Sequence, residues 1–193
     1  MFEQLFRSIQ EKVTLTQDEM ELCKAHFIPK KLRKKQTLLQ EGDVCIYNAF
    51  VEKGILRSFS IDQKGNEHIV QFAIEGWWIT DLSSFLTNSN SIYTIEALEN
   101  SELLLLTTEA REALMYQIPM FERYQRLLLQ NAYIANQARI NMSLTKTGKE
   151  KYINLGIAYP GIVNRVPQHM IASYLGLKPE TLSRIRKQIS TQI

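Results

Sequence analysis

The sequence predicts an α+β fold: an antiparallel β-roll or jelly roll with flanking helices, then a long helix, then a helix-turn-helix. Three observations predict it. Between Gln36 and Leu106, short apolar runs with a period of two are separated by Gly, Asp and Asn, which is typical of antiparallel strands. From Pro119 to Thr145 the apolar residues follow helical spacing. After Pro167, two short helical patterns flank Gly176.

The first 29 residues are predicted to be helical and to flank the β domain. Thr16 and Glu19 form a capping box that starts a second helix. Apolar residues recur in the first helix at three- and four-residue spacing: Phe2, Leu5, Phe6 and Ile9. The basic run Lys30–Lys35 follows, and we interpret it as a solvated loop ahead of the first strand. The alternative is a nucleic-acid-binding patch.

Short strands and tight turns alternate in the next segment. Asp62–Asn66 has the composition of a hairpin turn, and Lys53-Gly54 joins two further strands. The predicted strands are Thr37–Leu39, Tyr47–Glu52, Ile55–Ile61, Glu67–Ile74, Tyr93–Leu98 and Glu102–Leu106.

Helical spacing returns after Thr107, with Thr108 as the expected cap and Pro119 as the start of the long helix. Its apolar stripe is Met120, Tyr124, Leu127, Ile134 and Ala138, interrupted by Asn131. Such a stripe favours a coiled coil with a second copy, in which one polar residue fixes the register. The alternative is a helix packed on its own domain. We expect Thr147-Gly148-Lys149 to be a hinge.

The segment from Pro167 to Ser190 is predicted to be a helix-turn-helix. Gly176 can take the positive φ of the turn, and Pro179 suits the first turn of the second helix. Residues expected to be buried are Ile171, Ala172, Leu175, Leu182 and Ile185. The second helix of such a motif enters the major groove of DNA.

The C-terminal unit is basic although the chain is nearly neutral. Residues 146–193 hold eight Lys or Arg and two Glu, a net charge of +6, whereas residues 1–145 hold fifteen basic and eighteen acidic side chains. Such a surplus of cationic side chains favours phosphate binding. The charge pattern therefore indicates DNA binding rather than an ordinary helical hairpin.

Composition excludes several classes of protein. No apolar run approaches the roughly 20 residues of a membrane span, and Glu3 and Arg7 exclude a signal peptide, so we expect a cytoplasmic protein without membrane contact. Cys23 and Cys45 are too few for a metal or iron–sulfur site. No nucleophile elbow, HExxH motif or Gly-rich phosphate loop indicates an enzyme. We therefore expect no metal, no cofactor and no catalytic residue.

Particular segments resemble the Crp/Fnr family of bacterial transcription regulators, and the resemblance spans nearly the whole chain. They are Glu41–Asp43, Val51–Arg57, Asp62–Glu67 and, above all, Ile171–Arg186. The resemblance implies a cyclic nucleotide-binding-like β-roll that receives a signal over residues 1–118. It implies a dimerisation helix over 119–145 and a DNA-binding domain of the winged-helix type over 146–193. It also implies a homodimer on a palindromic DNA site, with RNA polymerase and an unidentified small-molecule effector as further partners.

In that family a Glu, a Ser or Gly, and an Arg of the second helix read each half-site, and here Glu180, Ser183 and Arg184 occupy these places. Arginine can donate two hydrogen bonds to guanine, and glutamate can accept one from cytosine. The resemblance therefore implies that these residues contact bases. Phosphate contacts are expected from His169, Lys178, Thr181, Arg186 and Lys187.

The chain departs from the members that bind cyclic AMP. Those members cradle the phosphate with Gly-Glu and a later Arg-Ser or Arg-Thr, and the corresponding stretches here are Trp78–Leu82 and Asn90–Thr94. No arginine lies between Arg57 and Arg111, so a buried phosphate would lack its bidentate partner. We expect an effector other than cyclic AMP. The alternative is a regulator whose DNA binding depends on cyclic AMP or cyclic GMP.

The candidate pocket for a different effector comprises Trp78, Asp81, Phe85 and Tyr93, the alternative being that the aromatic residues belong to the core. A second departure lies at the C-terminus. Only three residues follow Ser190, so we expect the wing hairpin to be missing and DNA binding to be weaker or altered in geometry.

Overall fold

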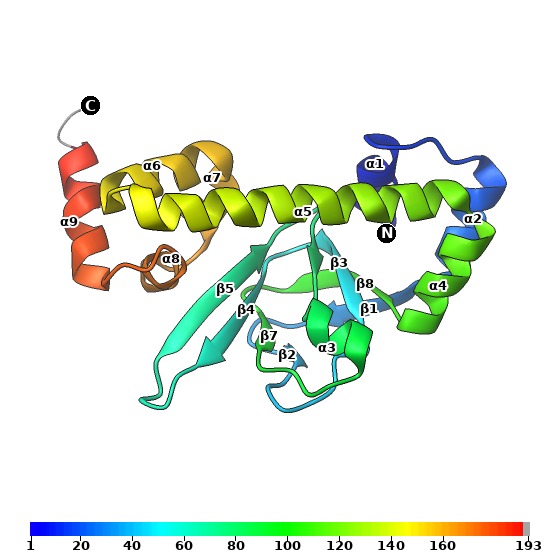
Figure 1. Cartoon of the computed structure of the whole chain (residues 1–193), viewed down its shortest axis with the longest axis horizontal. Coiled ribbons are helices and arrows are strands. Elements are labelled where there is room, and N and C mark those ends of the chain that lie inside the picture. Colours follow the sequence, from blue (N-terminus) through cyan, green and yellow to red (C-terminus); the bar gives the residue numbers. More distant parts are fainter. Residues whose placement is uncertain (191–193) are drawn as a thin grey trace.

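A computed structural model describes residues 1–190 and contains the expected β-roll, long helix and helix-turn-helix (Figure 1). The β-roll consists of two four-stranded antiparallel sheets. Sheet A has the order β1 (Ile28–Leu32), β8 (Ser101–Leu106), β3 (Asn48–Lys53) and β6 (Trp78–Ile79). Sheet B has the order β2 (Thr37–Leu39), β7 (Thr94–Ala97), β4 (Leu56–Ile61) and β5 (Glu67–Ala73).

Helices precede, interrupt and follow the β-roll. The capping box of Thr16 and Glu19 starts the second helix as predicted, and Pro119 is the first residue of the long helix. The helices are α1 (Glu3–Gln10), α2 (Gln17–His26), α3 (Leu82–Thr87), α4 (Thr108–Gln117), α5 (Pro119–Thr145), α6 (Gly148–Ala158), α7 (Pro160–Arg165), α8 (Gln168–Tyr174) and α9 (Pro179–Ser190).

Several local predictions were wrong. Lys30 and Lys31 lie in strand β1 rather than in a loop, because Ile28–Leu32 pairs with β8 along one edge. Thr107, not Thr108, caps α4, since its hydroxyl accepts a hydrogen bond from the amide of Ala110. The hinge expected at Thr147-Gly148-Lys149 stays a prediction: these residues lie at the joint between α5 and α6, where Thr147 and Glu150 form a second capping box.

Strand β8 divides the core of the β-roll. Leu103 and Leu105 point between the two sheets, whereas Leu104 and Leu106 point to the helices on the outer face of sheet A. The alternation follows from the two-residue period of a strand, and both faces are apolar because both are covered. Helices α1, α2, α4 and the start of α5 form that outer cover.

The outer face of sheet B packs on the C-terminal helices, so the β-roll and the helix-turn-helix share one apolar cluster. Its buried members are Ile55, Phe59, Ile69, Phe72, Leu155, Ile162, Val166, Ile171, Ala172 and Leu182. The helix-turn-helix is therefore packed against the β-roll rather than held only by a linker.

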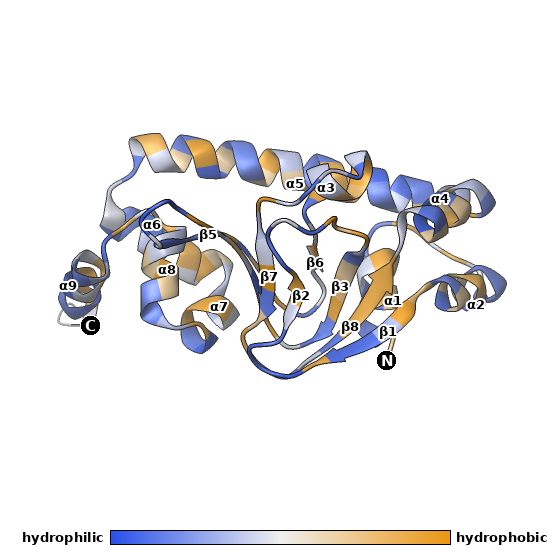
Figure 2. Cartoon of the chain, turned by 90° about the horizontal axis from the view of Figure 1, so that it is seen from below, coloured by the Kyte–Doolittle hydropathy of each residue, from blue (hydrophilic) through white to orange (hydrophobic). Residues whose placement is uncertain are grey.

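The long helix α5 has two parts. Tyr124, which the sequence assigned to a dimer stripe, is fully buried within its own domain, so the alternative interpretation holds for the first turns. Beyond Leu128 the helix is almost entirely exposed, including Ile134 at 65% and Leu144 at 81% of their full surface. Figure 2 shows hydrophobic bands continuing along this part of α5.

Among residues 1–190, no helix combines the length and apolar character needed to cross a membrane. The expected absence of a wing concerns the chain after Ser190 and lies outside the residues that the structure describes.

Candidate nucleic-acid interface

Helices α8 and α9 meet at a tight turn that local hydrogen bonds define. Gly176 has a φ of +67°, the left-handed conformation that glycine adopts readily. Its amide donates to the carbonyl of Ser173 at 3.0 Å, and the amide of Leu177 donates to the carbonyl of Ala172 at 2.9 Å. This pair of bonds is the Schellman arrangement, which ends α8 and directs the chain into α9.

Helix α9 has one buried and one exposed face. Leu182 and Ile185 are 1% and 7% exposed, and they pack α9 against the rest of the protein. Ser183 and Arg184 lie three and four positions after Glu180, on the opposite, exposed face. In Figure 1, α9 stands at the extreme end of the molecule, away from the sheets. The structure thus brings the three expected base-contacting residues together on one solvent-facing surface.

The residues expected to contact phosphates surround this face. His169, Lys178, Arg186 and Lys187 are exposed, and Thr181 is half-buried. The Thr181 hydroxyl accepts a hydrogen bond of 3.5 Å from the Arg184 guanidinium, which orients that arginine along the helix. A groove of about 640 Å³ lies between α8 and α9 and is lined by Gln168, His169, Pro179, Ser183, Arg186, Lys187 and Ser190.

The expected effector-pocket residues do not line one cavity. Trp78 packs in the cluster outside sheet A, with its ring 5.3 Å from that of Phe50, whereas Phe85 lies in the core between the sheets. Tyr93 is half-buried and Asp81 is buried. Trp78 and Phe85 therefore pack in apolar clusters on opposite sides of sheet A.

Asp81 and Ser91 come from the two stretches that correspond to the phosphate cradle of the cyclic AMP-binding members, and here they bond to each other. The Ser91 hydroxyl donates to one Asp81 carboxylate oxygen at 2.8 Å. The other oxygen caps α3 by accepting from the amides of Ser83 and Ser84. The start of α3 is therefore already occupied by a carboxylate of the chain itself, which repels another anion.

A small cavity of about 180 Å³ lies at another edge of the β-roll, near β2 and the loop before β3. It is smaller than the usual volume of a site for a drug-sized ligand, about 300–1,000 Å³. Its lining is Leu38, Leu39, Asp43, Val44, Cys45, Ile46, Tyr47 and Ile95.

Neither cysteine is placed for redox or metal chemistry. Burial, with a smaller effect of Glu19, raises the pKa of Cys23 to about 12, so its thiol stays protonated at neutral pH. The Cys45 thiol is buried and donates to the carbonyl of Tyr47 at 3.3 Å. Within residues 1–190, no three His, Cys, Asp or Glu side chains gather as metal ligands would.

Sequence reasoning missed the residues that attach the helix-turn-helix to the β-roll, chiefly Ser173 and Arg165. Ser173 follows the buried residue Ala172, which could have indicated a polar contact at that point of α8. Its partner Ile69 lies 104 residues away in the sequence, so periodicity could not identify it.

Comparisons with known proteins agree with this architecture. The family described as the cyclic nucleotide-binding domain matches residues 29–117. Regulatory protein HlyX of Actinobacillus pleuropneumoniae is 27% identical over 169 residues, which cover 81% of this chain and 69% of that protein. Transcriptional activator protein FnrA of Stutzerimonas stutzeri is 28% identical over 165 residues, or 80% of this chain and 67% of that one. The structure of FixK2 from Bradyrhizobium japonicum matches with a TM-score of 0.70 at 19% identity, covering 86% and 85% of the two chains.

Proposed function

We propose that the chain is a transcription regulator of the Crp/Fnr type, as its similarity to HlyX, FnrA and the cyclic nucleotide-binding domain family supports, and that it binds DNA sequence-specifically as a homodimer on a palindromic site. The observation that carries the proposal is the exposed polar face of α9, held by the buried Leu182 and Ile185. A helix presented in this way can enter the major groove with its N-terminal side chains against base edges.

Within this proposal, Arg184 donates two hydrogen bonds to guanine and Glu180 accepts one from cytosine, while Ser183 contacts an adjacent base. A carboxylate near DNA is repelled by phosphates, so its place on this face is explained by base contact. His169, Lys178, Thr181, Arg186 and Lys187 contact the backbone and set the register. The groove between α8 and α9 gives the phosphate backbone room beside these side chains.

Dimerisation is supported by the second part of α5. Ile134 lies with Leu127 and Ala138 on the predicted stripe and is 65% exposed in a single chain, so the same helix of a second copy would cover it. Asn131 lies on this stripe and specifies the register of the helix pair. The other exposed apolar side chains on this part of α5 are Leu129, Tyr133, Ile140 and Leu144. Two copies would place their α9 helices about 34 Å apart, one turn of DNA, and so favour a palindrome.

We assign the chain three functional parts and a cytoplasmic setting. Residues 1–118 form the effector-type domain, 119–145 the dimerisation helix and 146–193 the DNA-binding domain. RNA polymerase is a further partner in this proposal, and the β-roll either senses a small effector or has lost sensing.

The test compares one arginine variant and one lysine variant for binding to specific and to random DNA. Arg184→Ala should lose about 1–3 kcal/mol of discrimination, whereas Lys178→Ala should weaken binding to all sequences similarly. The operator is first selected from random DNA with the wild-type chain, and both affinities are measured at fixed salt, because phosphate contacts depend on it. An equal loss for Arg184→Ala on specific and random DNA would refute base readout by α9.

Dependence on cyclic AMP or cyclic GMP is the second candidate, favoured by the match to the cyclic nucleotide-binding domain family. The bond between Asp81 and Ser91 and the absence of an arginine from residue 58 to residue 110 weigh against it. Isothermal titration with both nucleotides at millimolar concentration decides the question. Saturable heat would establish cyclic-nucleotide binding. No heat would remove this second candidate, so that the chain either has another effector or has none.

A further inference from the structure

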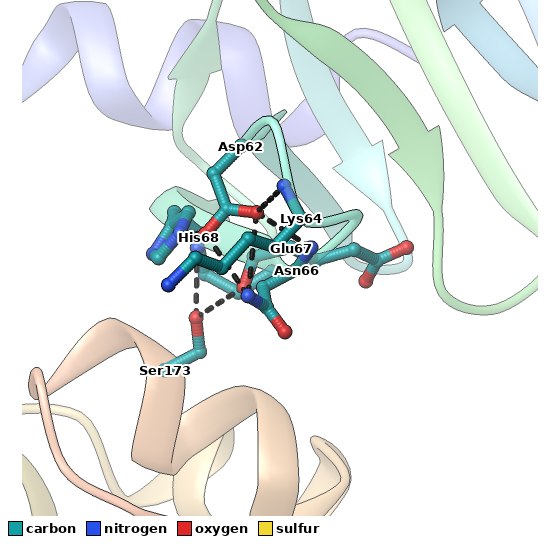
Figure 3. A network of polar contacts seen from close by, with 7 residues as sticks. Asp62, Lys64, Asn66, Glu67, His68 and Ser173 are labelled. Atoms are coloured by element: carbon teal, nitrogen blue, oxygen red, sulfur yellow. Dashed lines mark hydrogen bonds and ion pairs between the residues drawn. The ribbon is translucent and has the colours of Figure 1, made fainter.

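The edge of sheet B carries an unexpected connection to the helix-turn-helix. Strand β5 is the last strand of its sheet, so the amide of Ile69 and the carbonyl of Glu67 point outward from it. The Ile69 amide donates to the Ser173 hydroxyl at 3.0 Å, and that hydroxyl donates to the Glu67 carbonyl at 2.9 Å. Figure 3 shows Ser173 reaching from α8 to the hairpin backbone. The Ser173 side chain of α8 thus supplies two of the hydrogen bonds that a neighbouring strand would otherwise make with this edge.

The hairpin that receives Ser173 has hydrogen bonds within its own turn. In its turn, the Asp62 carboxylate accepts hydrogen bonds from the amides of Lys64 and Asn66 at 2.8 and 2.9 Å and contacts His68 at 2.9 Å (Figure 3). The pKa of Asp62 lies well below its usual value, chiefly because of the hydrogen bonds from Asn66 and His68. The β4–β5 hairpin, on which α8 packs, therefore has a turn whose backbone is held by hydrogen bonds.

A buried arginine ties Glu67 to the body of the β-roll. The Arg57 guanidinium is 4% exposed and makes two hydrogen bonds to the Glu67 carboxylate, one of them 3.1 Å long. It also donates to Glu96 on β7 at 3.2 Å. Hydrogen bonds to charged groups at a largely buried site are stronger than those between neutral groups. Glu67, whose carbonyl accepts the hydrogen bond from Ser173, is thereby linked through Arg57 of β4 to Glu96 of β7.

Further polar contacts attach the C-terminal part of the chain to the β-roll at other points. Arg165, at the end of α7, donates to both oxygens of Glu75 at 2.8 and 2.9 Å and also pairs with Glu99. Arg139 of α5 donates to the carbonyl of Val70 at 2.6 Å, with its guanidinium 5.4 Å from the ring of Tyr174. Helix α7 is thus attached to the β-roll through Arg165, and Arg139 of α5 contacts both β5 and Tyr174 of α8.

The aromatic contacts agree with the polar ones. Tyr174 lies 5.2 Å from Phe72 of β5, and Tyr159 lies 5.0 Å from Trp77, each measured between ring centroids. Since Leu182 of α9 belongs to the same apolar cluster, the orientation of α9 depends on how α8 sits against the β-roll.

We propose that Ser173, which binds the β4–β5 hairpin, and Arg165, which pairs with Glu75 after β5 and with Glu99 between β7 and β8, are positioning residues. They hold the helix-turn-helix on the β-roll and so determine which half-site spacing the dimer accepts. The inference rests on the proposed function. Neither side chain contacts DNA in this role. They limit the angles that α9 can take relative to α5, so a palindrome of the wrong spacing cannot be matched by rotation of the DNA-binding unit.

The test uses the full chain and palindromes built from the selected half-site, with spacings at the optimum and one or two base pairs away from it. The variant Ser173→Ala with Arg165→Met should reduce the preference for the optimal spacing at least about fivefold. Its binding to a single half-site should stay within about twofold of wild type, because α9 is unchanged. Ser83→Ala, at an exposed position of α3, is the matched control.

Hydrogen exchange of the Ile69 amide reports docking without DNA. Ser173→Ala should accelerate this exchange, and Ser173→Thr, which keeps a hydroxyl, should restore both the exchange rate and the spacing preference. Unchanged Ile69 exchange in Ser173→Ala would show that α8 does not dock there. Accelerated exchange with an unchanged spacing preference would show that docking does not position α9. A wild-type chain without sequence-selective DNA binding would remove the proposed function and the spacing effect, while Ile69 exchange would still decide whether the lock exists.

Discussion

The indole nitrogen of Trp78 donates a 3.1 Å hydrogen bond to the hydroxyl of Tyr124 and so joins sheet A to the first turns of α5. The same hydroxyl lies 3.0 Å from that of Ser8 on α1. The long helix is therefore anchored to the β-roll by a side chain that its apolar stripe would have offered to a partner. A ligand-induced shift of β6 would therefore move the first turns of α5 through this hydrogen bond.

Replacing Tyr124 with phenylalanine should lower the free energy of unfolding by about 1–2 kcal/mol. The change leaves the Trp78 N–H without its partner in a largely apolar cluster, and an unsatisfied donor costs more than a hydrogen bond contributes. Urea unfolding followed by tryptophan fluorescence measures it. Tyr116→Phe is the control, because Tyr116 is 90% exposed and should change stability by less than about 0.5 kcal/mol.

Glycine is required more strictly at position 54 than at position 42. Both have left-handed backbone, with φ of +103° and +92°. A Cβ at Gly54 would lie 2.8 Å from the Cα of Ser101, whereas one at Gly42 meets no atom within 4 Å. Gly42→Ala should therefore cost about 1–2 kcal/mol from backbone strain alone. Gly54→Ala should cost about 1–3 kcal/mol more, from the clash with β8. Equal melting temperatures of the two variants would contradict this.

The ion pair between Glu75 and Arg165 should make stability depend on pH in the acid range. Partial burial raises the pKa of Glu75, but hydrogen bonds from Arg165 and the Gly54 amide outweigh it and lower the pKa from 4.5 to about 2. A carboxyl with a lower pKa in the folded state stabilises that state above its unfolded pKa. The contribution is thus complete above about pH 4.5 and is lost as the pH falls toward 2. The free energy of unfolding, measured with urea between pH 6 and pH 3, should fall less steeply with decreasing pH for Glu75→Gln than for wild type. Parallel curves would show that this ion pair does not contribute to the pH dependence of stability.

Charges on the exposed part of α5 should dissociate the dimer without unfolding the chain. Ile134 and Leu144 are 65% and 81% exposed in one chain, so aspartate at both positions costs little in the monomer. Burying such side chains contributes about 1.5–3 kcal/mol each, and every 1.4 kcal/mol changes a dissociation constant tenfold. Ile134→Asp with Leu144→Asp should therefore raise the dimer dissociation constant at least about 100-fold in sedimentation experiments. Asn136→Asp, an exposed polar position on the same helix, should leave the dimer intact.

Local signals predicted those elements whose ends are set by their own residues. The capping box at Thr16, Pro119 at the start of α5 and Gly176 in the final turn all act within a few residues of the chain. Helix α3 was not predicted, because its six residues are too few to show a helical period of apolar positions. Strand β1 was missed because its basic residues are stabilised as a strand only by pairing with β8.

By itself, the sequence determined the order of the elements and the polar face of α9, since periodicity and turn chemistry depend on neighbours along the chain. Tertiary structure alone decided which apolar side chains of α5 are used within the domain. Tyr124 and Ile134 lie on the same predicted apolar stripe, yet Tyr124 is fully buried and Ile134 is 65% exposed. It also decided that Ser173 meets Ile69, because a hydroxyl finds a strand edge only after the sheet has formed and the helix has packed beside it.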